Sequence, residues 1–426
     1  MRRAGLFFLV VLTMVLLHRL TAAAPLPGRA VLALGFLVTA SLVLGAWAET
    51  VKVPAVTAYV VTGFVLGPSW LGLIRGDEVA ALGFTGDVVL AATALVAGTS
   101  LRLGALSLDR RSLLRFLGAT ALGPAACVAL VMVALAHWFP PTAHEPFGDL
   151  LIVALVVGAS AIASSPTLTI ATTGAEQGFA QAMLGANVAR DLLAAALFAV
   201  IFIGAPLVSS PGAYDSHGAL RPLGLLLGSV VGGVAVALGG VCLARIGGVA
   251  SLLPPVLAGV AIALMARLLH LDPVFTGLMA GLCLIPWTRE GPLARGLGGI
   301  FDTLRAPLFA TAFGLLGAGI DLTDTSDLWG WVLVVAAARV VGLYAGGRWA
   351  ARHEVRMDLA RYGWVGLLSQ SGLILWLAAA ARHAFPEWGV SLQALIVGVV
   401  AVNAVLGPLA LRRVTLLVGD SLQRSA

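Results

Sequence analysis

The sequence predicts an all-α polytopic membrane protein, and three observations support this fold class. Of the 426 residues, 60% are hydrophobic and only 11% are charged. The mean hydropathy is +1.01, and a soluble domain of this length could not bury that much apolar surface. Apolar runs of membrane-spanning length also recur from one end of the chain to the other. We therefore expect about thirteen transmembrane helices.

Each expected helix is an apolar run bounded by charged, glycine or proline residues. The thirteen runs are Ala30–Ala48, Val53–Leu66, Val88–Leu101, Leu114–Trp138, Leu150–Ala171, Ala180–Leu207, Leu223–Ala244, Leu252–Leu269, Val274–Trp287, Pro307–Ile320, Trp331–Trp349, Tyr362–Ala381 and Leu392–Leu411. The second and ninth runs are short for a hydrocarbon core of about 30 Å. Each of these two runs is therefore nearly untilted or partly re-entrant.

The first 24 residues allow two interpretations. Met1–Arg3 precede the apolar stretch Ala4–Leu17, and the small residues Ala22–Ala24 are typical of a signal-peptide cleavage site. With Leu20 and Thr21 included, the same stretch is long enough for an extra first helix. Residues 1–24 are thus a signal peptide or an additional helix, residues 25–414 form one transmembrane domain, and residues 415–426 form a short tail.

The arginines divide the loops into two sets. Four segments are rich in arginine, namely residues 102–115, 289–305, 348–361 and 412–424. Counting spans places all four on one side, and the opposite loops are mostly acidic. The positive-inside rule therefore puts these segments and the C-terminus in the cytoplasm of a multi-pass protein of the cell membrane, with a bacterial inner membrane as the expected location. Because the net charge of +6 lies in loops that flank the membrane, it predicts no nucleic-acid partner.

Two consecutive runs contain residues that a membrane helix normally avoids. Leu150–Ala171 includes the sequence GASAIASSPTLT, in which Pro166 lacks a backbone N–H and is expected to break or kink the helix. The next run places Arg190 and Asp191 near mid-span, where a charge costs about 2.5–3.5 kcal/mol and normally faces a cavity. A broken helix beside a mid-membrane carboxylate is typical of the ion site of a secondary transporter.

A second interrupted helix follows near the C-terminus. Tyr362–Ala381 is broken near its middle by Gln370, Ser371 and Gly372, and the run before it carries Arg339 near mid-depth. The fourth, fifth and sixth runs thus have counterparts seven spans later. Since an offset of seven reverses membrane orientation, we expect inverted repeats whose two interrupted helices cross at mid-membrane. Arg339 would offset the negative helix ends and the carboxylate.

Three local patterns resemble those of the monovalent cation/proton antiporter family, the large sodium or potassium/proton exchangers. Val53–Pro68, which reads VPAVTAYVVTGFVLGP, is similar to the second-helix signature of that family. Ser164–Thr169, SSPTLT, is similar to its unwound helix, and Pro307–Gly314, PLFATAFG, is similar to its tenth-helix pattern. The likeness covers about residues 30–411. It implies a homodimer in the lipid bilayer, with a dimerisation domain and a core domain that moves like an elevator.

The resemblance also implies roles for single residues. The ion-binding aspartate of the family falls on Asp191, and its basic residue in the eleventh helix falls on Arg339. The residue before the aspartate is usually Asp, Asn or Gln, whereas Arg190 stands there in this chain. A second carboxylate is therefore missing, and we expect electroneutral one-for-one exchange of Na⁺ or K⁺ for protons by alternating access at Asp191.

Asp191 is the expected metal ligand because a cation and a proton can compete for one carboxylate. Hydroxyl and carbonyl oxygens at Ser164, Ser165 and Thr167 would complete the shell of a hard cation. Arg339 should not carry protons, since a guanidinium keeps its charge over the usable pH range. We expect no cofactor.

Other interpretations remain open at this point. Asp191 could form a structural pair with Arg190 or Arg339 that only holds helices together. An anion or organic-acid transporter on the same crossed-helix plan would use the two arginines, which outnumber the carboxylate. An enzyme is not expected, because the seven histidines lie at helix ends or in loops without paired ligand spacing.

Overall fold

In the computed structural model, nearly all of the described chain is helical, and no strand occurs among the described residues. The structure describes residues 12–14, 25–99, 101, 110–143, 145–173, 178–208, 221–247, 253–288, 292–320, 328–352, 357–385 and 388–425. Residues 12–14 are helical, but the rest of the 1–24 segment lies outside the described residues. The choice between a signal peptide and an extra helix therefore stays a prediction.

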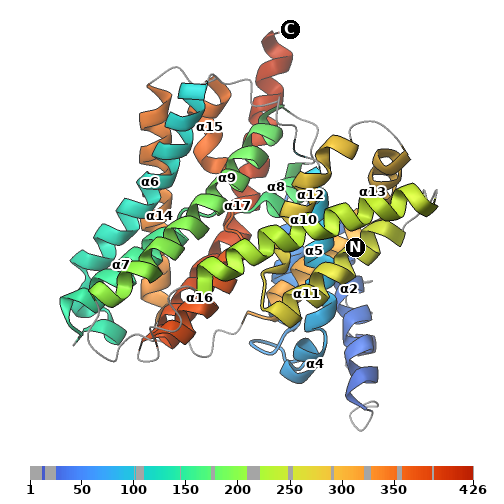
Figure 1. Cartoon of the computed structure of the whole chain (residues 1–426), viewed down its shortest axis with the longest axis horizontal. Helices are drawn as coiled ribbons and strands as arrows, with labels where there is room; N and C mark the ends of the chain where they lie inside the picture. Colours follow the sequence, from blue (N-terminus) through green and yellow to red (C-terminus); the bar gives the residue numbers. More distant parts are fainter. Residues whose placement is uncertain are drawn as a thin grey trace. The chain divides into compact units, whose positions relative to one another are not determined.

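The chain forms two compact units, each made from two separate stretches of sequence. Unit 1 comprises residues 1–101 and 228–321, and unit 2 comprises residues 102–227 and 322–426. Helix α10 (Arg221–Gly247) begins in unit 2 and continues into unit 1. The other helices of unit 1 are α2 (Leu26–Thr50), α3 (Ala55–Leu66), α4 (Gly76–Ala81), α5 (Gly83–Thr99), α11 (Leu253–Leu269), α12 (Pro273–Thr288) and α13 (Pro292–Ala318) (Figure 1).

In unit 1, glycines bring helix backbones into direct contact. A Cβ atom added at Gly63 of α3 would lie 1.9 Å from the backbone oxygen of Gly314 in α13, and one added at Gly317 would lie 2.1 Å from the oxygen of Val60. Such distances are impossible for a real side chain, so only glycine permits this approach. The second-helix and tenth-helix patterns of the sequence therefore pack against each other.

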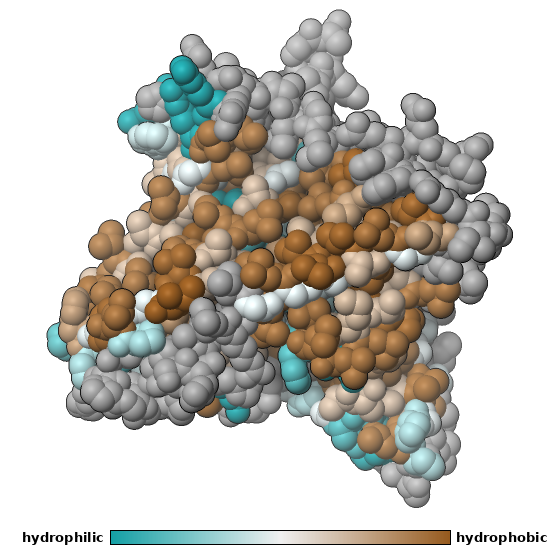
Figure 2. All heavy atoms as spheres, in the orientation of Figure 1, coloured by the Kyte–Doolittle hydropathy of each residue, from teal (hydrophilic) through white to brown (hydrophobic). Residues whose placement is uncertain are grey.

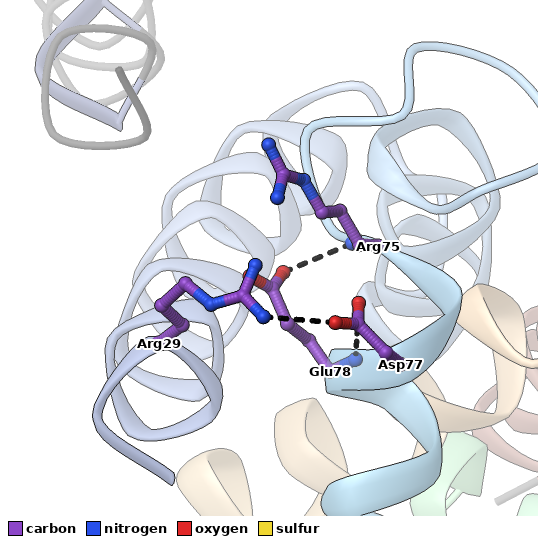
Figure 3. Close-up of polar contacts among 4 residues, drawn as sticks. All are labelled: Arg29, Arg75, Asp77 and Glu78. Atoms are coloured by element: carbon purple, nitrogen blue, oxygen red, sulfur yellow. Dashed lines mark hydrogen bonds and ion pairs between the residues drawn. The ribbon is translucent and has the colours of Figure 1, made fainter. Parts of the chain in front are cut away.

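A polar cluster joins α2 to the short helix α4. Arg29 pairs with Asp77 at 2.9 Å, and the backbone N–H of Arg75 donates to the buried carboxylate of Glu78 at 2.9 Å. Figure 3 shows the guanidinium of Arg29 directed at these two acids from the neighbouring helix. The pairs compensate charges that would otherwise be poorly solvated beside the apolar helices.

A buried acid precedes α12. Asp272 is 4% exposed, and its carboxylate accepts a short hydrogen bond from the backbone N–H of Phe275, as a helix-capping residue does. Burial raises the pKa of Asp272 from its ordinary value of 3.8 to about 6, the bond to Phe275 lowers it, and the nearby Asp87 raises it further. Arg267 neutralises Asp87 at a distance of 2.8 Å.

Unit 2 contains the two broken helices. Its helices are α6 (Arg110–Ala134), α7 (Phe147–Ser160), α8 (Pro166–Thr173), α9 (Gly178–Gly204), α14 (Trp329–Ala351), α15 (Met357–Gly366), α16 (Leu373–Ala384) and α17 (Gly389–Ser425). Helices α7 and α8 together occupy one predicted run, and α15 and α16 occupy another. The prediction of two interrupted helices in inverted repeats is confirmed.

Helices α6 and α14 of unit 2 also meet through small residues. A Cβ added at Gly123 would lie 2.4 Å from the oxygen of Gly342, and one added at Gly346 would lie 2.2 Å from the oxygen of Ala119. This approach sets α14, which carries Arg339, firmly against α6.

The described helices account for all thirteen predicted runs, with some boundaries moved. Six helices, α2, α6, α9, α10, α14 and α17, are long and apolar enough to cross a membrane among the described residues. Helix α17 continues through Ser425, so residues 415–425 extend the last helix. Large apolar side chains such as Leu192, Leu193 and Val200 of α9 are 40% to 64% exposed, and brown apolar atoms cover much of the described surface in Figure 2. Such a surface fits a lipid environment.

Candidate functional site

The two interruptions of unit 2 meet and bond to each other. Helix α7 ends at Ser160 and α8 begins at Pro166, while α15 ends at Gly366 and α16 begins at Leu373. The backbone N–H of Ser165 donates to the carbonyl oxygen of Ser369 at 2.9 Å. The unwound segments are therefore in direct backbone contact, as the crossed-helix prediction requires.

Local sequence explains where the first break falls. Pro166 was expected to lie at the break, but it is the first residue of α8, and residues 161–165 form the unwound segment. Proline suits this first helical position because its missing N–H would have no intrahelical partner there. The hydroxyl of Ser165 accepts the backbone N–H of Leu168 at 3.1 Å and so caps α8.

The second break lies where it was predicted. The unwound residues 367–372 include Gln370, Ser371 and Gly372. The amide of Gln370 donates to the oxygen of Ser160 at 2.9 Å, and Asn403 of α17 donates to the Gln370 oxygen at 3.0 Å. Gln370 therefore ties the end of α7 to α17 across the crossing.

Arg339 binds the carbonyl groups that the two breaks release. Its guanidinium, which is 0% exposed, donates to the oxygens of Ala161 at 3.1 Å and Ala163 at 3.1 Å in the first segment. It also donates to Leu367 at 2.9 Å and Leu368 at 2.6 Å in the second. Carbonyls at the end of a helix carry partial negative charge, and a buried guanidinium offsets it. The role of Arg339 in charge compensation stays a prediction, and the structure gives its contacts with both unwound segments.

Asp191 lies at the same crossing and receives one donor from each unwound segment. The backbone N–H of Ser164 donates to Oδ1 at 3.3 Å, and the hydroxyl of Ser371 donates to Oδ2 at 2.8 Å. The carboxylate is 2% exposed. Ser371 was predicted only as a helix-breaking residue, and the structure makes it a partner of the carboxylate.

Arg190 faces a different neighbour from Asp191, because adjacent helical residues point about 100° apart. Its Nε donates to the hydroxyl of Ser164 at 3.1 Å, and its Nη1 makes a short hydrogen bond to the carbonyl oxygen of Thr120 in α6. Pro124 lies four residues after Thr120 and has no N–H to occupy that carbonyl. A proline in α6 thus supplies the acceptor that anchors Arg190.

The other predicted oxygen ligands are placed beside the crossing. The hydroxyls of Ser165 and Thr167 lie 3.0 Å apart and bond to each other. The hydroxyl of Ser164 donates to the carbonyl of Leu367 at 3.0 Å while accepting from Arg190. Of the predicted ligands, Ser164 is joined to Asp191 directly, through its backbone N–H.

Sequence reasoning missed Asn187. Its Nδ2 donates to the carbonyl of Ser165 at 3.3 Å and to Thr169 at 2.7 Å, and its Oδ1 is buried without a hydrogen-bond partner among the described residues. Asn187 precedes Asp191 by four residues, so both lie on one face of α9. That spacing is the signal that could have identified it.

This arrangement can hold a small hard cation or a proton. Within the described residues no group of three or more His, Cys, Asp or Glu side chains gathers. The donor set is one carboxylate with hydroxyl, amide and carbonyl oxygens, which are hard ligands suited to alkali cations rather than to thiophilic metals.

Comparison with known proteins agrees with this geometry. Two solved structures of the sodium proton antiporter MjNhaP1 from Methanocaldococcus jannaschii have the same fold. The structure at pH 8 is 16% identical with a TM-score of 0.57, covering 92% of this chain and 99% of that one. The electron-microscopy structure is 16% identical with a TM-score of 0.65, covering 89% and 94%. No curated protein is matched. The family model for the transmembrane region of sodium/hydrogen exchangers matches residues 37–416. The chain belongs to this family of transporters.

Proposed function

We propose that this protein exchanges a monovalent cation, Na⁺ or K⁺, for protons by alternating access at Asp191. The observation that carries the proposal is the position of this carboxylate. It is buried at the crossing of two unwound segments and takes one hydrogen bond from each. Family membership supports cation/proton exchange in general, and the geometry favours Asp191 as the exchanging group.

Competition at one carboxylate explains how the two ions are coupled. A proton or an alkali cation that binds Asp191 neutralises its negative charge. The carboxylate oxygens can then give up the hydrogen bonds that stabilise the ionised form. Oxygens near the carboxylate, including the buried Oδ1 of Asn187 one turn earlier, supply further ligands for the cation. A single carboxylate then accepts one proton or one monovalent cation in each half of the cycle.

The two arginines keep a fixed charge and do not titrate. Arg339 is anchored to four carbonyls and Arg190 to one carbonyl and one hydroxyl. Because neither gains nor loses charge, the exchange is one cation for one proton and moves no net charge.

The division into two units supports an elevator mechanism. We assign the mobile core to unit 2, which holds the crossing with Arg190, Asp191 and Arg339, and the homodimer contact to unit 1. The arginine-rich loops favour a cytoplasmic C-terminus, in what we take to be a bacterial inner membrane.

Proteoliposomes with a pH-sensitive dye test this function. Pulses of Na⁺, K⁺ or Li⁺ should dissipate an imposed pH gradient, and Asp191→Asn should abolish the response. Asp272→Asn is the matched control, since it removes a buried carboxylate of unit 1 outside the site. Exchange that survives in Asp191→Asn contradicts the assignment, and a rate that depends on imposed membrane potential contradicts electroneutrality.

A further inference from the structure

Within the described part of the chain, one nitrogen of the buried arginine beside the site has no hydrogen-bond partner. Arg190 is 1% exposed, and its Nε and Nη1 bond to Ser164 and Thr120. Its Nη2 has no hydrogen-bond partner among the described residues. A buried charged donor without a partner is costly, and such a group usually indicates an ordered water or an ion.

The charges around the crossing favour an anion over water. The buried charged side chains described in unit 2 are Arg190, Arg339, Asp191 and Asp149. Asp149 lies in the first turn of α7, eleven residues before Ser160 and therefore about 16 Å from the crossing. Two fixed positive charges thus face one carboxylate. Counted as formal charges, before the carbonyl dipoles around Arg339 are considered, the local excess rises from +1 to +2 when Asp191 takes up a proton or a cation.

We propose that Arg190 binds a small monovalent anion such as chloride through Nη2, as a resident of the core of unit 2. A water molecule would complete the hydrogen bonding but leave the positive charge uncompensated in a medium of low dielectric constant. An anion supplies both the acceptor and the opposite charge. Arg339 differs because four carbonyl dipoles already surround its guanidinium.

The consequence for transport rests on the proposed exchange function. An exchanger stays coupled when its empty site carries a charge that is costly to move through the membrane. Because four carbonyl dipoles already offset the charge of Arg339, an uncompensated Arg190 would balance the ionised, empty Asp191 and allow the core to move without cargo. A bound anion cancels Arg190, restores the negative charge of the empty site and so enforces exchange.

Anion binding is tested on the purified full-length protein by thermal unfolding. Chloride is compared with gluconate, which is too bulky for a buried site, at constant sodium concentration and ionic strength. Chloride should raise Tm with a saturable dependence in the wild type and in Arg382→Gln, which removes an exposed arginine of the same unit. The dependence should be absent in Arg190→Gln. Equal shifts in Arg190→Gln, or no chloride-specific shift in the wild type, overturn the proposal and leave water as the partner.

A second variant keeps the test decisive if Arg190→Gln does not fold. Asp191→Asn removes the negative charge next to Arg190 in the chain, so the chloride concentration at half-maximal shift should fall by about tenfold or more. An unchanged or higher midpoint contradicts an anion at Arg190. This readout needs no transport. Exchange that persists in Asp191→Asn would refute only the proposed function, whereas a chloride-independent Tm would refute only the anion site.

Discussion

Replacing Arg339 by glutamine should destabilise unit 2 more than any other single change at the crossing. The guanidinium makes four hydrogen bonds to carbonyls, at 2.6 to 3.1 Å, and is fully buried. Each hydrogen bond to a charged group contributes about 1.5–3 kcal/mol, so the gross loss is about 6–12 kcal/mol. Removing the buried charge returns several kcal/mol of desolvation cost, which leaves a net destabilisation of about 3–5 kcal/mol.

Thermal unfolding of the detergent-solubilised protein, followed by tryptophan fluorescence, measures this loss. For a cooperative unit of about 150–250 residues, each kcal/mol lowers Tm by about 2–4 °C, so Arg339→Gln should lower it by about 6–20 °C. Arg339→Lys should give an intermediate value, because its ammonium keeps the charge but cannot span four carbonyls as a planar guanidinium does.

The matched control is Arg382→Gln, which removes an exposed arginine with one hydrogen bond of 3.3 Å to Gln393. A surface change of this kind should stay within about 0.5 kcal/mol of the wild type. If Arg339→Gln unfolds at the same temperature as this control, the released carbonyls must be satisfied in another way and the structural reasoning is wrong.

Three further outcomes follow from contacts in the two units. Gly63→Ala should lower Tm, at a cost of about 1–3 kcal/mol, because its new Cβ would lie 1.9 Å from a backbone oxygen and would push α3 away. Gly35→Ala is the control: its Cβ would have nothing within 4 Å, so it should not destabilise α2 in the same assay. Asp272 has a pKa of about 6 when folded against 3.8, so its contribution to stability is full below pH 3.8 and is lost as pH rises through 6; Asp272→Asn should flatten that slope of Tm against pH. Ser371→Ala removes a 2.8 Å donor that stabilises the empty, ionised Asp191 and that a cation must replace, so it should lower the cation KM of exchange about tenfold; an unchanged or higher KM would contradict this role of the contact.

The sequence was sufficient to predict the apolar helices and the two breaks. Apolar runs and interrupting polar residues are local signals, and each spans enough residues to be recognised without tertiary information. The partner of Arg190 could not be predicted this way. Its acceptor is a carbonyl of Thr120, seventy residues earlier, and it becomes available only because Pro124 is packed within a helix beside α9. Ser371 was likewise identified by its helix-breaking position and not by its contact with Asp191.

At the crossing, the arginines and Asp191 have different kinds of hydrogen-bond partner, and this difference favours exchange at the acid. Five carbonyls that Pro124 and the two unwound segments release from the backbone ladder accept hydrogen bonds from an arginine. Asp191 instead receives a 3.3 Å N–H and a rotatable hydroxyl. Fixed backbone acceptors hold the guanidinium groups in place, since leaving them would strand several buried carbonyls. The hydroxyl of Ser371 can rotate away from the carboxylate, so a proton or a cation can replace this donor at much lower cost. This difference in partners is the reason why we propose the acid, and not an arginine, as the exchanging group.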